Sequence, residues 1–142
     1  MLATKPSLVL KRRIKAPPTK VYAAWTDPKK MMRWWGPDDG PTLHVEACVR
    51  VGGHFRVRFR TMDGKDHECS GVYQEVVPDR KLAFTWNWAG PPERESLVTV
   101  HLKPDGDGTL LTLIHEQIVD DTMHDYFRGW TGALDKLERL CA

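Results

Sequence analysis

The sequence has no long hydrophobic run, little cysteine and no leader of the secretory type. Its longest unbroken apolar stretch is residues 21–25, far shorter than the ~20 residues that a membrane-spanning helix needs. The first residues lack the basic and then apolar order of a signal peptide. Cys48, Cys69 and Cys141 are an odd number without a dense framework, so we expect free thiols. These absences predict a soluble, cytoplasmic protein without a membrane span.

Motifs of nucleophilic, phosphoryl-transfer and dinucleotide chemistry are also missing. The chain holds no Gly-x-Ser-x-Gly elbow, P-loop or Gly-x-Gly-x-x-Gly fingerprint. Gly52-Gly53 is too short to cradle phosphates and is typical of a turn that enters a strand. Residue types that bind zinc occur at His44, Cys48, His67 and Cys69, but their expected separations along and across strands are too large for one ion. We predict no metal and no cofactor.

The residues that are present suit one domain, residues 1–142, with a real core or an internal cavity. Six tryptophans place a large apolar area in a small chain, and each indole N–H needs a hydrogen-bond partner if it is buried. Residues 1–71 hold 14 Lys and Arg against 7 Asp and Glu, whereas residues 72–142 hold 7 against 12. Such asymmetry is typical of a basic binding surface. The pI of ≈ 8.5 lies below that of dedicated nucleic-acid-binding domains, so nucleic acid is not a predicted partner.

The N-terminal part predicts one strand and two short helices. Residues 7–15 alternate between two faces, as a strand does, and the prolines that follow end it. A helix is expected over 18–25, with Pro18 in its first turn. Asp27 is a good cap for a second helix over 28–34, which Gly36-Pro37 ends.

Between Thr42 and Gln117 the hydrophobic period is two, which predicts a series of antiparallel strands. The strands are expected over 54–61, 66–77, 81–88, the residues around Val98 to Leu102, and 109–116. Asp63-Gly64 and the Asp105 to Gly108 segment are turn signals, and Gly90-Pro91-Pro92 predicts a loop. Gly71 lies inside a strand and predicts a bulge where the sheet bends.

After Asp121 and Thr122, either of which suits a helix cap, the period becomes helical over about 20 residues. Gly129 and Gly132 interrupt this helix, and we expect them to permit close approach to the sheet. The order of elements predicts an α+β fold. Its sheet is curved and antiparallel, with about seven strands, two short helices follow strand 1, and a long C-terminal helix crosses the concave face.

This pattern resembles the START-like, helix-grip (SRPBCC) superfamily, which includes birch-pollen-type allergens. Within it, the chain is most similar to the group of homologues of the activator of the heat-shock-protein-90 ATPase. The likeness runs in order through 16–28 (APPTKVYAAWTDP), 33–37 (RWWGP), 49–56 (VRVGGHFR), 71–78 (GVYQEVVP), 82–86 (LAFTW), 108–113 (GTLLTL) and 129–130 (GW). Cys48 departs from the group, which often has an acidic residue there. The resemblance implies a helix-grip fold and leaves the chemistry open, because the superfamily mixes binders, chaperone cofactors and enzymes.

The predicted ligand-binding residues face inward from the sheet, the C-terminal helix and the tryptophan pair. They are Trp34, Trp35, Phe55, Phe59, Phe84, Trp86, Trp88, Val100, Leu113, His115, Phe127 and Trp130. The same set fits a fully packed core that needs no ligand, and it is the resemblance that favours the cavity.

Polar residues of the predicted sheet give few further candidates. His115 has the parity of Leu111 and Leu113, and it is the single catalytic candidate, because an imidazole suits acid–base work near neutral pH. The alternative is a hydrogen-bonded core histidine. Glu46 and Arg50 are spaced to line the cavity or to form a salt bridge at its rim.

Three functions remain open from the sequence. The first is non-enzymatic binding of a small hydrophobic, lipid-like or aromatic ligand, which the resemblance links to stress responses. The second is a chaperone-cofactor-like interaction module, with Arg56, Arg58 and Arg60 facing an acidic partner. The third is a cyclase- or hydratase-type enzyme that uses His115. Among oligomers, a homodimer is expected on frequency alone.

Overall fold

The computed structural model describes residues 7–89, 95–118 and 123–141. The predicted loop at Gly90-Pro91-Pro92 and the predicted caps Asp121 and Thr122 lie outside these residues. Within them, no helix has the length and apolar character needed to cross a membrane.

The chain begins with β1 (Leu8–Ile14), α1 (Pro18–Thr26) and α2 (Pro28–Met31). Pro18 is the first residue of α1, and the Asp27 carboxylate accepts a 3.0 Å hydrogen bond from the backbone N–H of Lys29. The predicted end of the second helix at residue 34 is wrong. The backbone N–H groups of Trp34 and Trp35 both bond to the Met31 carbonyl, so the chain turns tightly there and both indoles enter the core.

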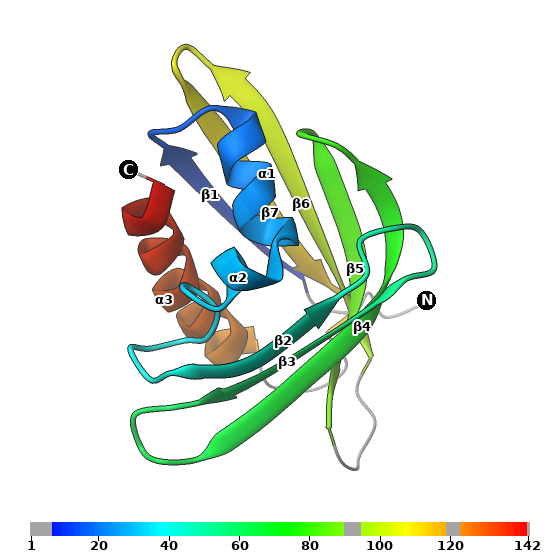
Figure 1. Ribbon diagram of the computed structural model, residues 1–142, viewed down its shortest axis with the longest axis vertical. Helices are drawn as coiled ribbons and strands as arrows, with labels where there is room; N and C mark the ends of the chain where they lie inside the picture. The colour runs from blue at the N-terminus through cyan, green and yellow to red at the C-terminus, as the bar shows by residue number, and fades with distance from the viewer. Residues whose placement is uncertain (1–6, 90–94, 119–122, 142) are drawn as a thin grey trace, which may run out of the picture.

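Six more strands form a meander, and β1 joins its far edge. They are β2 (Thr42–Ala47), β3 (His54–Arg60), β4 (Asp66–Val77), β5 (Lys81–Trp88), β6 (Ser96–Asp105) and β7 (Gly108–Glu116). The seven strands pair antiparallel in the order β1-β7-β6-β5-β4-β3-β2. Because β1 and β2 lie at opposite edges, α1 and α2 carry the chain across the sheet, and the loop after α2 lies beside the concave face (Figure 1).

Gly71 does not mark a bulge, contrary to expectation. The register between β4 and β5 shifts between Tyr73 and Glu75 instead. A Cβ at Gly71 would overlap the carbonyl oxygen of Thr85, so the glycine is required by the close approach of two backbones. The backbone N–H of Val72 then bonds to the Thr85 hydroxyl at 2.9 Å.

The long helix α3 (Met123–Cys141) packs beside β1 and contacts α1. Arg12 of β1 donates to Asp135 at 2.7 Å and to Glu138 at 3.5 Å, which ties the helix to the sheet edge. The sequence predicts that Gly129 and Gly132 let the helix approach the sheet, but the nearest neighbour of both is Pro37. Gly132 permits close approach to Pro37, because a Cβ at this position would overlap the Pro37 carbonyl oxygen, whereas a Cβ at Gly129 would meet only the Pro37 side chain, at 3.6 Å.

The core is an aromatic cluster between the helices and the concave face. The rings of Trp25 and Trp34 lie 4.6 Å apart, and the ring of Trp35 stacks on that of Trp86 at 5.8 Å. In the described part of the chain, the indole N–H groups of Trp25 and Trp86 have no hydrogen-bond partner. The expectation that every buried indole finds one is therefore wrong for these two.

The predicted fold is confirmed in its main features. The sheet has seven antiparallel strands, two short helices follow β1, and a long helix ends the fold. The alternation of β3 is also confirmed, because Phe55, Val57 and Phe59 are buried while the arginines between them are exposed.

Candidate ligand pocket

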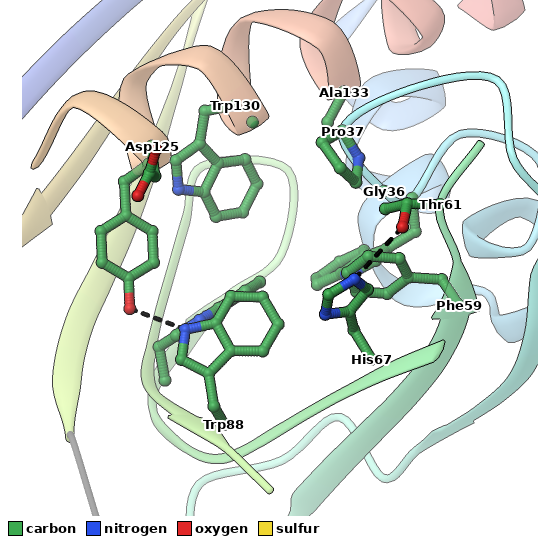
Figure 2. Close-up of a pocket in the computed structure, with 13 residues that line it drawn as sticks. Gly36, Pro37, Phe59, Thr61, His67, Trp88, Asp125, Trp130 and Ala133 are labelled. Carbon is green, nitrogen blue, oxygen red and sulfur yellow. Dashed lines mark hydrogen bonds between the residues drawn. The ribbon is translucent and has the colours of Figure 1, made fainter. Parts of the chain in front are cut away.

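A pocket of ≈ 330 Å³ lies between the N-terminal half of α3 and one end of the sheet (Figure 2). Its third wall is the segment that follows α2. The lining consists of Trp35, Gly36, Pro37, Phe59, Thr61, His67, Trp86, Trp88, Asp125, Tyr126, Gly129, Trp130 and Ala133. Three segments that are distant in sequence therefore meet around one space.

Aromatic rings form most of the pocket wall, and several of them meet at steep angles. The planes of Trp86 and Trp88 are inclined by 83° with centroids 5.4 Å apart, and those of Trp86 and Trp130 by 59° at 5.2 Å. Phe59 is inclined by 61° to Trp88 at 6.2 Å. The wall therefore contains corners, while two other neighbouring pairs, Trp35 with Trp86 and Trp88 with Tyr126, are nearly parallel at 11° and 16°.

The polar groups of the lining are few, and several bond to one another. The indole Nε1 of Trp88 donates to the hydroxyl oxygen of Tyr126 at 2.8 Å, and Thr61 Oγ1 shares a 3.2 Å hydrogen bond with His67 Nε2 (Figure 2). Asp125 is exposed in the first turn of α3. Apolar surface with a small number of placed polar groups is the usual form of a small-molecule site.

Lys136 holds the third wall in place. Its ammonium donates to the backbone carbonyls of Trp35, at 3.1 Å, and Asp38, at 2.6 Å. Partial burial lowers the pKa of this lysine from its ordinary value. The contacts fix the segment after α2 to α3. No pattern in the sequence indicates them, because an isolated lysine on a helix is usually solvated.

His115 lies next to the pocket residues without lining the pocket. Its ring is completely buried, Nδ1 accepts from the indole N–H of Trp130 at 3.0 Å, and Nε2 lies 2.7 Å from the hydroxyl of Ser96. Since Nδ1 is an acceptor in the neutral ring, Nε2 carries the proton and donates to Ser96. Burial lowers the pKa of His115 from 6.5 to about 4.

This arrangement does not suit His115 to general-base catalysis. An imidazole that activates a serine must accept the hydroxyl proton at Nε2, whereas here Nε2 donates. Both nitrogens are engaged, and the ring does not reach the pocket. The structure thus places His115 as a hydrogen-bonded core residue.

The predicted site residues divide between the pocket and the core. Trp35, Phe59, Trp86, Trp88 and Trp130 line the pocket. The other predicted residues that are buried do not line it, namely Trp34, Phe55, Phe84, Val100, Leu113 and His115. The indole of Trp35 is thus in the pocket wall, while the indole N–H of Trp34 donates to the Ala24 carbonyl at 2.8 Å inside the core.

The prediction that Phe127 faces inward is wrong. Its side chain is 48% exposed, and Tyr126 faces the pocket instead. Tyr126 and Phe127 lie four and three residues before Trp130, about 100° apart on the helix and on either side of Trp130, and the pocket lies on the side of Tyr126. Spacing in the sequence does not choose between the two residues, because i, i+3 and i, i+4 neighbours of Trp130 both lie near its face.

The arginines of β3 are exposed, and acidic neighbours compensate the charges of Arg56 and Arg60. Arg56 lies 2.8 Å from Glu46 and 3.9 Å from Glu68, and Arg60 donates to Asp66 at 2.6 Å. The pKa values of Glu46 and Asp66 are both lowered. For Glu46 the first cause is the hydrogen bond with His44 and the second is that from Arg56; for Asp66 the first cause is the hydrogen bond from Arg60. The basic stripe predicted from the sequence is therefore part of a mixed surface.

Other sequence candidates are separate in space. Glu46 pairs with Arg56 and with His44, at 2.7 Å, rather than with Arg50. No group of three or more potential metal-binding side chains occurs within the described residues. Cys48, Cys69 and Cys141 are free thiols, and burial raises the pKa of Cys69.

A curved antiparallel sheet around a long C-terminal helix, with a pocket between them, defines a helix-grip protein of the SRPBCC superfamily. The family model for the Activator of Hsp90 ATPase homolog 1-like protein matches residues 15–142. The chain belongs to this family.

Solved structures agree with this assignment. Protein CV1439 from Chromobacterium violaceum is 28% identical with a TM-score of 0.88, and the match covers 95% of this chain and 96% of that one. CalU16 from Micromonospora echinospora is 30% identical with a TM-score of 0.73, over 96% and 76% of the two chains. The AHSA1-like protein from Aeromonas hydrophila shares the fold at 24% identity and a TM-score of 0.81, over 95% and 91%. No functionally curated protein matches the chain.

Proposed function

We propose that the protein binds a small, largely apolar ligand in the pocket between α3 and the end of the sheet, without catalysing a reaction. The observation that carries this proposal is a pocket of ≈ 330 Å³ with four tryptophans in its wall. The space is partly open to solvent, so a small molecule can enter it, and the largely apolar wall gives that molecule a surface against which to lose its hydration.

The size of the pocket limits the ligand. An apolar cavity of ~150 Å³ is large enough to bind benzene, so about twice that volume suits a ligand of roughly two fused rings or a short branched chain. The pocket is at the lower end of the ~300–1,000 Å³ that small-molecule sites occupy. A long-chain lipid would extend beyond it.

The same site gives little support to the enzymatic alternative. His115, the catalytic candidate from the sequence, is neutral, fully hydrogen-bonded and outside the pocket. The interaction-module alternative relied on the exposed stripe of Arg56, Arg58 and Arg60. Arg56 and Arg60 bond to carboxylates of this chain, and Arg58 is exposed. Ligand binding is therefore the function that the geometry favours.

The test is a screen by nuclear magnetic resonance that follows the six indole N–H signals of ¹⁵N-labelled protein. The library holds monocyclic and bicyclic aromatic compounds and short-chain lipids. We expect binders to shift the signals of Trp88 and Trp130, whose rings line the pocket, and to leave that of Trp34 in place, because its N–H is bonded to Ala24 within the core.

Two variants control this screen. Ala133→Leu extends a side chain of α3 into the pocket and should abolish the shifts, whereas Phe127→Leu changes an exposed residue of the same helix and should leave them intact. Indole signals that stay unmoved by every compound in the library would overturn the proposal. Shifts that persist in Ala133→Leu would place binding elsewhere.

A further inference from the structure

The formal charges of the residues that line the pocket indicate which ligands it can bind. Although the chain holds 21 Lys and Arg, none of those that the structure describes lines the pocket. Among the described residues, Asp125 is the only one of the lining with a formal charge when histidine is neutral. Lys136 bonds through its ammonium to the backbone carbonyls of Trp35 and Asp38 and does not line the pocket, so an anionic group that entered would lose its hydration without a direct cationic partner, which is unfavourable. The pocket is consequently suited to neutral or positively charged groups.

The aromatic wall favours a positive group over a neutral one. The faces of indole, phenol and phenyl rings carry partial negative charge, and a cation within ~6 Å of a ring centroid is attracted to it. Trp86, Trp88 and Trp130 meet at 83° and 59°, with Phe59 at 61° to Trp88. The corners that Trp88 and Trp130 form with Trp86 can surround a compact, rounded group with ring faces on more than one side.

Asp125 supplies negative charge at the edge of the pocket. Figure 2 shows its side chain on the α3 side of the pocket, near Trp130. The N-terminus of a helix carries the equivalent of about half a positive charge, so a full negative charge in the first turn of α3 leaves the edge of the pocket negative. The carboxylate is exposed and is available to an approaching cation.

We propose that the pocket receives a quaternary or tertiary ammonium group carried on a small apolar body. This rests on the proposed function, because it names the chemical class of ligand for the same pocket. A methylated ammonium fits better than a primary one, since a primary ammonium brings three N–H donors that each need an acceptor. The lining offers few acceptors, and Thr61 and His67 already bond to each other.

The experiment compares three probes of similar size by the same indole N–H signals and by calorimetry. They are benzyltrimethylammonium, its neutral carbon analogue neopentylbenzene, and phenylacetate. We expect the cation to bind about tenfold more tightly than the neutral analogue, and the anion to bind most weakly.

Two variants separate the sources of this preference. Trp88→Leu keeps an apolar wall but removes one ring face and the bond to Tyr126, so both affinities can fall, and that for the cation should fall about threefold more than that for neopentylbenzene. Asp125→Asn should lower only the affinity for the cation, about threefold, as expected for one charge at the edge of a solvated site. Glu138→Gln is the matched control, because it neutralises a carboxylate of α3 that does not line the pocket.

The outcomes distinguish this proposal from the one it rests on. If neopentylbenzene binds as tightly as the cation, or Trp88→Leu weakens both equally, the ammonium proposal is overturned and apolar binding stands. If none of the three probes binds while compounds of the aromatic library do, the ammonium proposal is likewise overturned and apolar binding stands. If neither the library nor the probes bind, both proposals fail.

Discussion

The indole of Trp88 donates a 2.8 Å hydrogen bond to the hydroxyl oxygen of Tyr126, and this bond joins the end of β5 to the first turns of α3. The two ring planes are inclined by only 16°, with centroids 6.4 Å apart. Both residues line the pocket (Figure 2). One contact therefore helps to fix the distance between the helix and the sheet on the side where the pocket lies.

Trp88→Phe tests this connection. The variant loses the N–H donor and part of the buried ring, so we expect the free energy of unfolding to fall by about 1–2 kcal/mol. The measurement is urea denaturation at constant slope. Phe127→Leu, on the exposed side of α3, should change stability by less than about 0.5 kcal/mol. Equal effects of the two substitutions would contradict a role for the Trp88 contact.

Gly129→Ala and Gly132→Ala test the contact between α3 and the Pro37 segment, and we expect them to change the free energy of unfolding in opposite directions. A Cβ at Gly129 would meet only Pro37 Cβ, at 3.6 Å, so alanine should stabilise the protein by about 0.5–1 kcal/mol through its higher helix propensity. A Cβ at Gly132 would overlap the Pro37 carbonyl oxygen, and the forced shift should destabilise by about 1–3 kcal/mol. Denaturant midpoints measure both, and stabilisation by Gly132→Ala would show that the helix does not contact the Pro37 segment.

The buried His115 predicts a dependence of stability on pH. Its pKa is about 4 in the folded protein, against 6.5 for an ordinary histidine, so between these values the unfolded chain binds more protons. Stability is therefore complete above pH ~6.5 and falls as the pH decreases towards 4, by a total of the order of 3 kcal/mol from this residue.

His115→Gln isolates that contribution. The amide is neutral throughout the range, so the difference in unfolding free energy between the two proteins should shrink as the pH falls from about 7 to about 4. Carboxylates titrate in both proteins and cancel in the difference. A difference that stays constant over this range would mean that His115 is not a buried neutral imidazole.

Val100→Phe distinguishes the packed part of the core from the pocket. Val100 is 1% exposed on β6, the strand that α1 packs against, and it does not line the pocket. The larger side chain has no space to enter, so we expect a loss of about 1–3 kcal/mol and an unchanged affinity for pocket ligands. Unchanged stability would indicate a second space beneath α1.

The strands and helices were predictable because each repeats a simple physical pattern. The alternation of Phe55, Val57 and Phe59 with arginines identifies β3 and its buried face, and Asp63-Gly64 identifies the turn after it, where Gly64 has φ of +85°. Such signals are local, since a strand face or a turn depends on residues that are adjacent in sequence.

The position of the pocket was less predictable, because it depends on packing between distant segments. Alternation alone marks Phe84 and Val100 as inward-facing, in the same way as Trp86 and Trp88, and it does not say which of them a helix covers. The covering is decided by the tight turn at Trp34-Trp35 and by the Lys136 contacts with the carbonyls of Trp35 and Asp38. Neither leaves a periodic signal in the sequence.

Ala133→Leu is the sharpest test of whether the space between α3 and the end of the sheet is a ligand pocket. Ala133 lines the pocket and is itself buried, so the added carbons should fill existing space and bury apolar area worth about 25 cal/mol per Å². We predict a denaturant midpoint that is unchanged or raised, by up to about 2 kcal/mol in unfolding free energy. Binding of a bicyclic aromatic compound such as 1-naphthol, measured by quenching of tryptophan fluorescence, should be lost at the same time. A lowered midpoint with undiminished binding of 1-naphthol would mean that this space is filled and that the ligand site lies elsewhere.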